Sequence, residues 1–141
     1  MPDSPVTVVL PCLDEAASLP GVLAALPAGY RALVVDNNST DGTAEVARRH
    51  GADVVAERRP GYGSAVHAGV AAATTPIVAV LDADGSLDPR ELPGLVDDVE
   101  RGADMAIGRR RAVPGLKWPW HARLGTAAVC WRLRTRHGLQ V

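Results

Sequence analysis

The chain has 141 residues, a length that suits one domain with a single core. Hydrophobic residues make up 47% of it and charged residues 22%, as in ordinary soluble globular proteins. No apolar run reaches the roughly 18 residues of a membrane-spanning helix, and the apolar start at residues 6–13 lacks the basic residues of a signal peptide. Two cysteines, Cys12 and Cys130, are too few for a disulfide framework and fit no zinc site. We therefore expect a cytoplasmic protein with reduced thiols.

Charge is distributed unevenly along the chain. All 16 acidic residues lie between Asp3 and Asp104, whereas residues 105–141 hold 8 of the 15 lysines and arginines and no acidic residue. Such a basic segment is typical of contact with an anionic partner, which would be a nucleic acid, a phospholipid surface or a phosphorylated substrate. The alternative is a solvated basic helix that folds back on the acidic body.

The predicted elements alternate between strand and helix. Short aliphatic and β-branched runs predict strands, and segments bounded by capping residues, prolines and glycines predict helices. We expect strands at 6–10, 32–35, 52–56, 77–81 and 103–107, and helices at 19–26, 41–50, 61–73, 88–101 and 119–136. Ser18 and Asp41 are the expected caps of the first two helices.

This alternation predicts an α/β fold with an open, mainly parallel sheet and helices on both faces. The unbroken apolar run at 77–81 indicates a strand buried on both faces. We expect a core domain over residues 1–113 and a basic amphipathic C-terminal segment over residues 114–141, where an acceptor-binding region would begin.

Polar residues gather where the predicted strands end. Ligands of open parallel sheets bind beyond the carboxyl ends of the strands, so clusters that follow all five strands indicate one site. The clusters are Pro11, Asp14 and Glu15; Asp36, Asn37 and Asn38; Gly61, Tyr62 and Gly63; Asp82 and Asp84; and Gly108, Arg109 and Arg110.

Asp82 and Asp84 follow the most apolar strand and precede Gly85. Two carboxylates at this spacing can share one Mg²⁺ or Mn²⁺ ion, which completes its coordination with water and substrate phosphates. The alternative is a solvated turn, in which aspartate and glycine are common. The position after an apolar strand, beside the other clusters, favours the metal.

Other residues have two interpretations each. Asp36 suits hydrogen bonds from a nucleobase or ribose, or merely a loop before a capped helix. Glu15 either contacts a ligand or favours a helix start, and Gly61 and Gly63 either admit a phosphate or form a plain turn. A dinucleotide-binding domain would need a glycine-rich loop after the first strand, and residues 11–15 contain no glycine.

The motifs at 8–15, 34–43, 61–65 and 81–85 together resemble family 2 glycosyltransferases of the GT-A fold, over about residues 6–110. Within that family the chain is most similar to dolichyl- or polyprenyl-phosphate sugar transferases. Two departures stand out, since Ser86 replaces a frequent glutamine and Arg109 replaces a frequent serine. Such domains usually continue well past residue 141, so we expect a truncated chain.

The resemblance implies a role for each matching position. It implies that the nucleotide sugar is bound by Pro11, Leu13, Glu15, Asp36, Gly61, Gly63, Asp82 and Ala83. It also implies that Asp82 and Asp84 hold Mg²⁺ or Mn²⁺, and that Asp82, Asp84 and Arg110 are catalytic, with Arg110 reaching toward phosphate.

The implied function is metal-dependent, inverting transfer of a sugar from a UDP- or GDP-sugar to a polyprenyl-phosphate-type acceptor. One alternative is a soluble transferase that acts on a small phosphorylated acceptor. Another is a non-catalytic nucleotide-sugar-binding fragment that needs a partner. We expect no nucleic acid partner, and the oligomeric state, including a homo-oligomer, stays open.

The basic segment has an amphipathic pattern between residues 118 and 136. Its apolar stripe at helical spacing comprises Trp120, Leu124, Ala127, Ala128 and Trp131, with arginines on either side. This pattern suits a helix at the inner surface of a membrane, and equally a helix that packs its stripe on the sheet.

Overall fold

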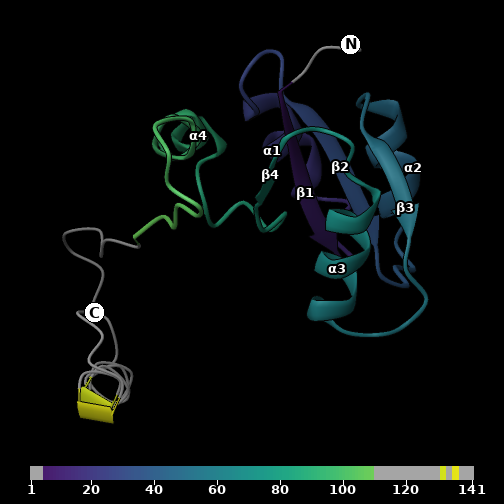
Figure 1. Cartoon of the computed structure of the whole chain (residues 1–141). Helices are drawn as coiled ribbons and strands as arrows, with labels where there is room; N and C mark the ends of the chain where they lie inside the picture. Colours follow the sequence, from purple (N-terminus) through teal and green to yellow (C-terminus); the bar gives the residue numbers. More distant parts are fainter. Residues whose placement is uncertain (1–4, 110–130, 133–134, 137–141) are drawn as a thin grey trace, which may run out of the picture. The chain divides into compact units, whose positions relative to one another are not determined.

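The computed structural model describes residues 5–109, 131–132 and 135–136, and it divides the chain into two compact units, residues 1–107 and 108–141 (Figure 1). The strands of the first unit are β1 (Val6–Cys12), β2 (Arg31–Asp36), β3 (Asp53–Ala56) and β4 (Ile77–Val80). Its helices are α1 (Leu19–Ala25), α2 (Thr43–Arg49), α3 (Tyr62–Ala72) and α4 (Leu92–Glu100), with a short 3-10 helix, η1 (Pro89–Glu91), before α4.

The four strands form one parallel sheet in the order β3-β2-β1-β4. Cys12 at the end of β1 pairs with Asp36 at the end of β2, and Asp36 pairs with Ala56 at the end of β3. The carboxyl ends of the strands therefore meet at one edge of the sheet, as the sequence predicts.

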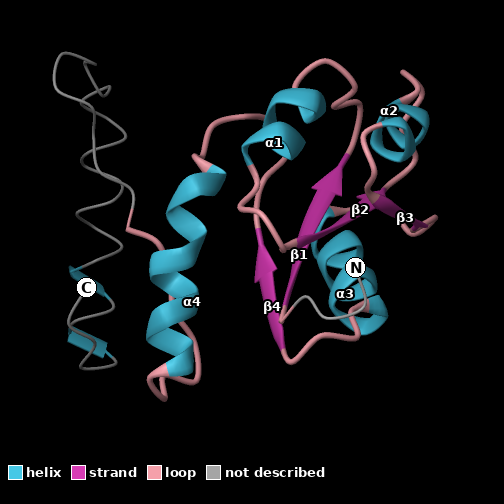
Figure 2. Ribbon diagram, turned by 90° about the horizontal axis from the view of Figure 1, so that it is seen from above, coloured by secondary structure: helices cyan, strands magenta, loops and turns pink. Residues whose placement is uncertain are grey.

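Helices cover both faces of this sheet (Figure 2). One buried cluster joins alternate β1 residues, such as Val8 and Leu10, to α1, α2 and α4. The other joins Val9 and Val35 to α3 through Ala65. Because β1 has helices on both sides, six of its seven residues are buried, and the predicted open α/β sheet is confirmed.

The prediction for residues 77–81 is wrong in one respect. β4 is a strand, but it lies at the edge of the four-stranded sheet, and its residues are half-buried or, at Val80, 41% exposed. The strands with buried residues on both faces are β1 and its neighbour β2. A continuous apolar run therefore marked a strand of the sheet without giving its place in the strand order.

The predicted fifth strand is not present at residues 103–107. This stretch follows α4 as irregular chain, with Met105 73% and Ile107 77% exposed. A strand needs a neighbour for its backbone hydrogen bonds, and among the described residues none pairs with it.

Most of the predicted C-terminal helix lies outside the described residues. Within it, Trp131, Arg132, Thr135 and Arg136 are described, and all four are helical. The predicted domain boundary after residue 113 also lies outside the described residues and stays a prediction. In the described part of the chain, no helix has the length and apolar character needed to cross a membrane.

Helix α3 approaches the sheet unusually closely at Gly69. A Cβ atom at this position would lie 2.3 Å from Val9 Cγ1 and 2.9 Å from Val35 Cγ2, and both distances are shorter than van der Waals contact allows. The missing side chain lets the helix backbone rest on the two valines, and the first residue of the helix, Tyr62, reaches the carboxyl edge of the sheet.

Candidate functional site

A cleft of about 580 Å³ lies at the carboxyl edge of the sheet. The loops after all four strands contribute to it, which is the arrangement expected for ligand binding in open parallel sheets. Its lining residues are Pro11, Cys12, Leu13, Glu15, Asn37, Asn38, Pro60, Gly61, Tyr62, Ala65, Asp82, Ala83 and Asp84.

Seven predicted site residues line this cleft: Pro11, Leu13, Glu15, Gly61, Asp82, Ala83 and Asp84. Asp36 does not, because its carboxylate turns back and accepts a hydrogen bond from the Ser39 backbone N–H at 3.0 Å. Gly63 lies on α3 away from the lining, and Arg110 lies outside the described residues. The roles of Asp36, Gly63 and Arg110 stay predictions.

The loop after β1 is joined to the loop after β2 by side-chain contacts. Asp14 Oδ1 accepts from the Thr40 backbone N–H at 2.7 Å, and the Asp14 backbone N–H donates to Ser39 Oγ at 3.0 Å. The Glu15 backbone N–H donates to the buried Thr43 hydroxyl at 3.0 Å. These contacts fix the backbone that presents Glu15 to the cleft.

Asp41 also belongs to this junction. The predicted cap lies one residue too early, since Gly42 is the N-cap of α2. The Asp41 carboxylate nevertheless accepts from the Thr43 backbone N–H at 3.0 Å and from the Ala16 backbone N–H at 2.9 Å. Its pKa is lowered, mainly because the Thr43 hydroxyl donates to it and further because the Ala16 N–H does.

Asn37 joins the loop after β2 to the loop before α3. This side chain is buried, and its amide nitrogen donates to the backbone oxygens of Glu57 and Arg59, each at 2.8 Å. Its oxygen accepts from the Gly61 backbone N–H at 2.8 Å. All the contacts go to backbone, so Asn37 determines the path of the chain into α3.

Two further contacts reach the loop after β4. The Tyr62 hydroxyl donates to Asp82 Oδ1 at 3.0 Å. The Ser18 hydroxyl, at the start of α1, lies 2.8 Å from the Ala83 backbone oxygen and 2.6 Å from Glu15 Oε2. Together with the junctions at Asp41 and Asn37, these contacts form a closed ring of hydrogen bonds through the four loops around the cleft.

Sequence reasoning placed Tyr62 and Asn37 in the clusters at the strand ends but assigned neither a role in this ring, and it named Ser18 only as a helix cap. Tyr62 stands between two glycines that were singled out, and it is one of only two tyrosines in the chain. An aromatic residue with a polar tip next to a flexible glycine was a usable signal. The contact of Ser18 with Ala83 had no such signal, because 65 residues separate them.

Backbone conformation is unusual at three positions around the cleft. Asp14 has φ 56° and Asn38 has φ 70°, in the left-handed region that only aspartate, asparagine and glycine adopt readily. Gly61 has φ 121° and ψ 145°, a combination that is essentially restricted to glycine. Gly61 therefore has a conformational requirement that Gly63, inside a regular helix, does not share.

Negative charge is concentrated at this edge of the sheet. The Cys12 thiol lies buried below the cleft, and its pKa is raised from 9.0 to about 12, first by burial and then by Glu15, Asp36 and Asp41. The pKa of Tyr62 is raised by burial and by its hydrogen bond to Asp82. An anionic ligand at this edge needs compensating positive charge.

Asp82 and Asp84 are the residues that fit a divalent metal. Both line the cleft, and the buried Ala83 lies between them in the chain. Mg²⁺ and Mn²⁺ favour hard oxygen ligands and need only one or two protein carboxylates when phosphates and water supply the rest. Among the described residues, no group of three or more histidine, cysteine, aspartate or glutamate side chains is arranged to hold a metal. The donor set therefore suits a metal shared with a ligand.

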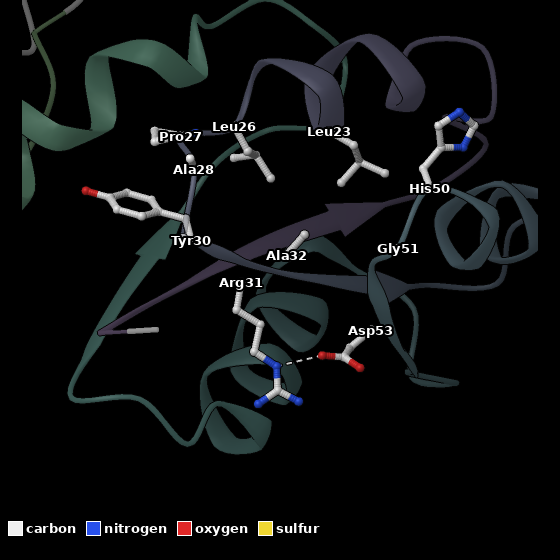
Figure 3. A pocket seen from close by; sticks show the side chains of 11 residues that line it. Leu23, Leu26, Pro27, Ala28, Tyr30, Arg31, Ala32, His50, Gly51 and Asp53 are labelled. Atoms are coloured by element: carbon white, nitrogen blue, oxygen red, sulfur yellow. Dashed lines mark hydrogen bonds and ion pairs between the residues drawn. The ribbon is translucent and has the colours of Figure 1, made fainter. Parts of the chain in front are cut away.

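A second cavity, of about 630 Å³, lies where β2 and β3 begin (Figure 3). Its charged side chains include Arg31 and Asp53, which form an ion pair at 2.6 Å. Its lining also includes Leu23 and Tyr30, and Asp53 is the one acidic residue among the described residues that line it. It is the larger of the two cavities, but it lies at the amino ends of the strands, where open parallel sheets do not usually bind ligands.

Fold and cleft together define an open α/β sheet with a cleft and a pair of carboxylates at its carboxyl edge. The chain matches glycosyl transferase family 2 over residues 7–140, and it therefore belongs to that family. This confirms the resemblance of its sequence motifs.

Two relatives place the chain within this family. An uncharacterized glycosyltransferase of Mycobacterium tuberculosis is 73% identical over 136 residues, which are 96% of this chain and 62% of the relative. An undecaprenyl-phosphate 4-deoxy-4-formamido-L-arabinose transferase of Klebsiella pneumoniae is 36% identical over 118 residues, covering 74% of this chain and 36% of that protein. This chain thus spans less than two thirds of the length of the relatives that it matches.

Two solved structures of similar fold are sugar-phosphoglycerate synthases. Glucosyl-3-phosphoglycerate synthase of Mycobacterium tuberculosis, in complex with phosphoglyceric acid, has a TM-score of 0.61 and 32% identity over 69% of this chain and 40% of its own. Mannosyl-3-phosphoglycerate synthase of Rubrobacter xylanophilus has a TM-score of 0.60 and 30% identity over 67% of this chain and 35% of its own. The mycobacterial enzyme has also been crystallised with Mn²⁺ and UDP.

Proposed function

We propose that this chain forms the donor-binding half of a metal-dependent, inverting glycosyltransferase, which moves a sugar from a UDP- or GDP-sugar to a phosphorylated acceptor. The observation that carries the proposal is the cleft itself, which brings Glu15, Asp82 and Asp84 to one edge of the sheet in a family 2 chain. The nucleoside would lie against Pro11, Leu13 and Glu15, and the diphosphate would lie toward Asp82 and Asp84.

The charge of the cleft supports the metal requirement. A diphosphate that enters alone would be repelled by Glu15, Asp82 and Asp84, because like charges a few ångströms apart repel even at a partly solvated site. Mg²⁺ or Mn²⁺ on Asp82 and Asp84 would remove this repulsion. When bound, such an ion offsets the charge that develops on a leaving diphosphate.

The N-terminus of α3 supports the proposed position of the donor's phosphates. Its first turn begins at Tyr62, and Gly61, Tyr62 and Ala65 line the cleft. The first backbone N–H groups of an α-helix have no partner within the helix, and the helix dipole favours an anion there. Phosphate oxygens at this helix end would therefore gain hydrogen bonds that no side chain needs to supply.

For the acceptor we favour a polyprenyl phosphate. The similar undecaprenyl-phosphate transferase acts on such a lipid by its name, and a phosphate monoester with a second pKa near ~6 is a nucleophile at neutral pH without a general base. Arg110 would bind the acceptor phosphate. In this form of the proposal the protein works on the cytoplasmic side of a membrane, and residues 118–136 contact its surface.

A small phosphorylated acceptor is the second candidate. The observation that favours it is the similarity to two phosphoglycerate-glycosylating enzymes, at 30% and 32% identity. Both candidates carry a phosphate, but in the polyprenyl phosphate it is the attacking group, whereas a small acceptor that is anchored by its phosphate and attacks through a hydroxyl would need a general base.

A titration followed by an acceptor assay tests the proposal. UDP and GDP are titrated into the chain with Mn²⁺ and again with EDTA, and we expect one of them to bind only with the metal. UDP- and GDP-sugars are then supplied with undecaprenyl phosphate in anionic liposomes or with 3-phosphoglycerate. Lipid product supports the first candidate and water-soluble product the second, whereas metal-dependent binding without turnover identifies a fragment that needs a partner. If neither nucleotide binds, the proposal fails.

A further inference from the structure

Tyr62 makes the one side-chain hydrogen bond to the Asp82 carboxylate within the described residues. Its ring stands at the mouth of the cleft, 61% exposed, and its hydroxyl meets Asp82 Oδ1 at 3.0 Å. A donor that binds one oxygen of a carboxylate fixes the rotation of that group and leaves the other oxygen for a ligand. Asp82 Oδ2 is then the oxygen presented to the cleft.

The position of Tyr62 is itself determined by Asn37. The buried Asn37 side chain accepts from the Gly61 backbone N–H at 2.8 Å, directly before Tyr62. Its amide nitrogen also donates to the backbone oxygens of Glu57 and Arg59, which fixes the segment of chain before Gly61. Since α3 packs its backbone directly on the sheet at Gly69, both the start and the middle of the helix are fixed.

We infer that Tyr62 is a positioning residue for Asp82, anchored by Asn37, and that it sets the carboxylate rotamer which receives the metal–diphosphate. The inference rests on the proposed function and goes beyond it, because it assigns a task to a residue outside the predicted metal and catalytic sets. An aspartate at the end of a strand otherwise samples several rotamers, and ordering it on metal binding has an entropic cost. The Tyr62 hydrogen bond removes part of that cost beforehand.

Tyr62 could alternatively contact the nucleotide with its exposed ring. The two roles differ in what removal of the hydroxyl does. Loss of a positioning hydroxyl weakens the nucleotide binding that depends on Asp82 and the metal, whereas a contact made by the ring survives Tyr62→Phe and leaves binding unchanged.

The experiment compares Tyr62→Phe with Tyr30→Phe, the matched change at the other tyrosine, which lies in the cavity at the amino ends of the strands. Whichever of UDP or GDP binds the wild-type chain is titrated calorimetrically with Mn²⁺ and with EDTA. We expect Tyr62→Phe to weaken Mn²⁺-dependent binding about tenfold, at the lower end of the range for groups that orient metal ligands. Tyr30→Phe should leave it unchanged.

A double-mutant cycle with Asp82→Asn separates the two roles. In the Asp82→Asn background, Tyr62→Phe should cause no further loss of nucleotide affinity. An equal loss in both backgrounds would overturn the positioning role. So would unchanged binding by Tyr62→Phe in a wild-type chain that binds nucleotide.

One readout does not depend on nucleotide binding. The ¹³C resonance of the Asp82 side-chain carboxyl should shift in Tyr62→Phe, which keeps the aromatic ring, and should stay in place in Tyr30→Phe. A chain that binds neither UDP nor GDP but shows this shift would refute the proposed function and keep the Tyr62–Asp82 relationship. An unshifted resonance would refute the inference whatever the nucleotide does.

Discussion

The Ala16 backbone N–H donates to Asp41 Oδ2 at 2.9 Å and thereby ties the loop after β1 to the loop before α2. These residues lie 25 positions apart in sequence, in the loops that follow the neighbouring strands β1 and β2. The contact holds the segment that carries Glu15 against the segment that follows Asp36. The shape of the cleft therefore depends on a carboxylate that does not line it.

We predict that Asp41 stabilises the fold above its ordinary pKa and not below it. Its folded-state pKa is lowered, chiefly by the Thr43 hydroxyl, so its contribution is present above pH 3.8 and is lost as the pH falls further. Asp41→Ala should lower the free energy of unfolding at pH 7, and the difference from wild type should shrink by pH 3. Urea unfolding at both pH values measures this, with Glu45→Ala on α2 as the control.

The Cys12 thiol should be unreactive in the folded protein at neutral pH. Its pKa is raised to about 12 by burial and by Glu15, Asp36 and Asp41, so almost no thiolate is present at pH 7. In a Cys130→Ser chain, which leaves Cys12 as the one thiol, a disulfide reagent should react slowly until urea unfolds the protein. Rapid reaction of the folded chain would contradict the burial of Cys12.

The same group makes the fold sensitive to alkali. Because the folded pKa of Cys12 lies above the ordinary value of 9.0, its contribution to stability is fully present below pH 9 and is lost as the pH rises toward 12. Cys12→Ala should therefore flatten the decline of the unfolding free energy over this range. An unchanged decline would show that other groups cause it.

Two neighbouring glycines should respond to alanine in opposite ways. Gly61 has φ 121° and ψ 145°, so Gly61→Ala should cost roughly 1–3 kcal/mol of stability through backbone strain alone, since no atom lies near the added Cβ. Gly63 lies in α3 with open space around it, and Gly63→Ala should stabilise by up to about 1 kcal/mol. Thermal unfolding of both variants gives the comparison, and equal effects would contradict it.

Gly69→Ala should destabilise the protein through overpacking. The added Cβ would lie 2.3 Å from Val9 Cγ1, and the stiff, fully buried valine can move little. The expected cost is about 1–3 kcal/mol. The double variant Gly69→Ala, Val9→Ala should lose less than the sum of the two single variants, because each change relieves the other. Additive losses in chemical denaturation would show that the helix shifts instead.

The alternation of strands and helices could be predicted from the sequence because each element carries its own local pattern. The edge of the sheet that carries the site could also be predicted, since parallel strands bring their carboxyl ends together. Strand order could not be predicted in this way: the apolar run at 77–81 is the edge strand β4, and the covered strands are β1 and β2. Residues 103–107 had a strand-like composition but no pairing partner among the described strands.

The lining of the cleft was predicted in large part, and the contacts that hold it were not. Pro11, Glu15, Asp82 and Asp84 belong to recognisable motifs beside the strand ends. The Asn37 and Ser18 contacts go to backbone oxygens on distant loops. Backbone atoms carry no sequence signature, so such contacts become visible only when the chain is folded.

The close packing of α3 on the sheet at Gly69 affects how the width of the cleft can vary among related sequences. Val9 and Val35 are fully buried and do not line the cleft, but their methyl groups fix how near the helix lies to the sheet. Because Tyr62 is the first residue of that rigid helix, a bulkier or smaller side chain at either valine would change the width of the cleft mouth. Donor preference could thus be altered by exchanging core residues, with every ligand contact left as it is.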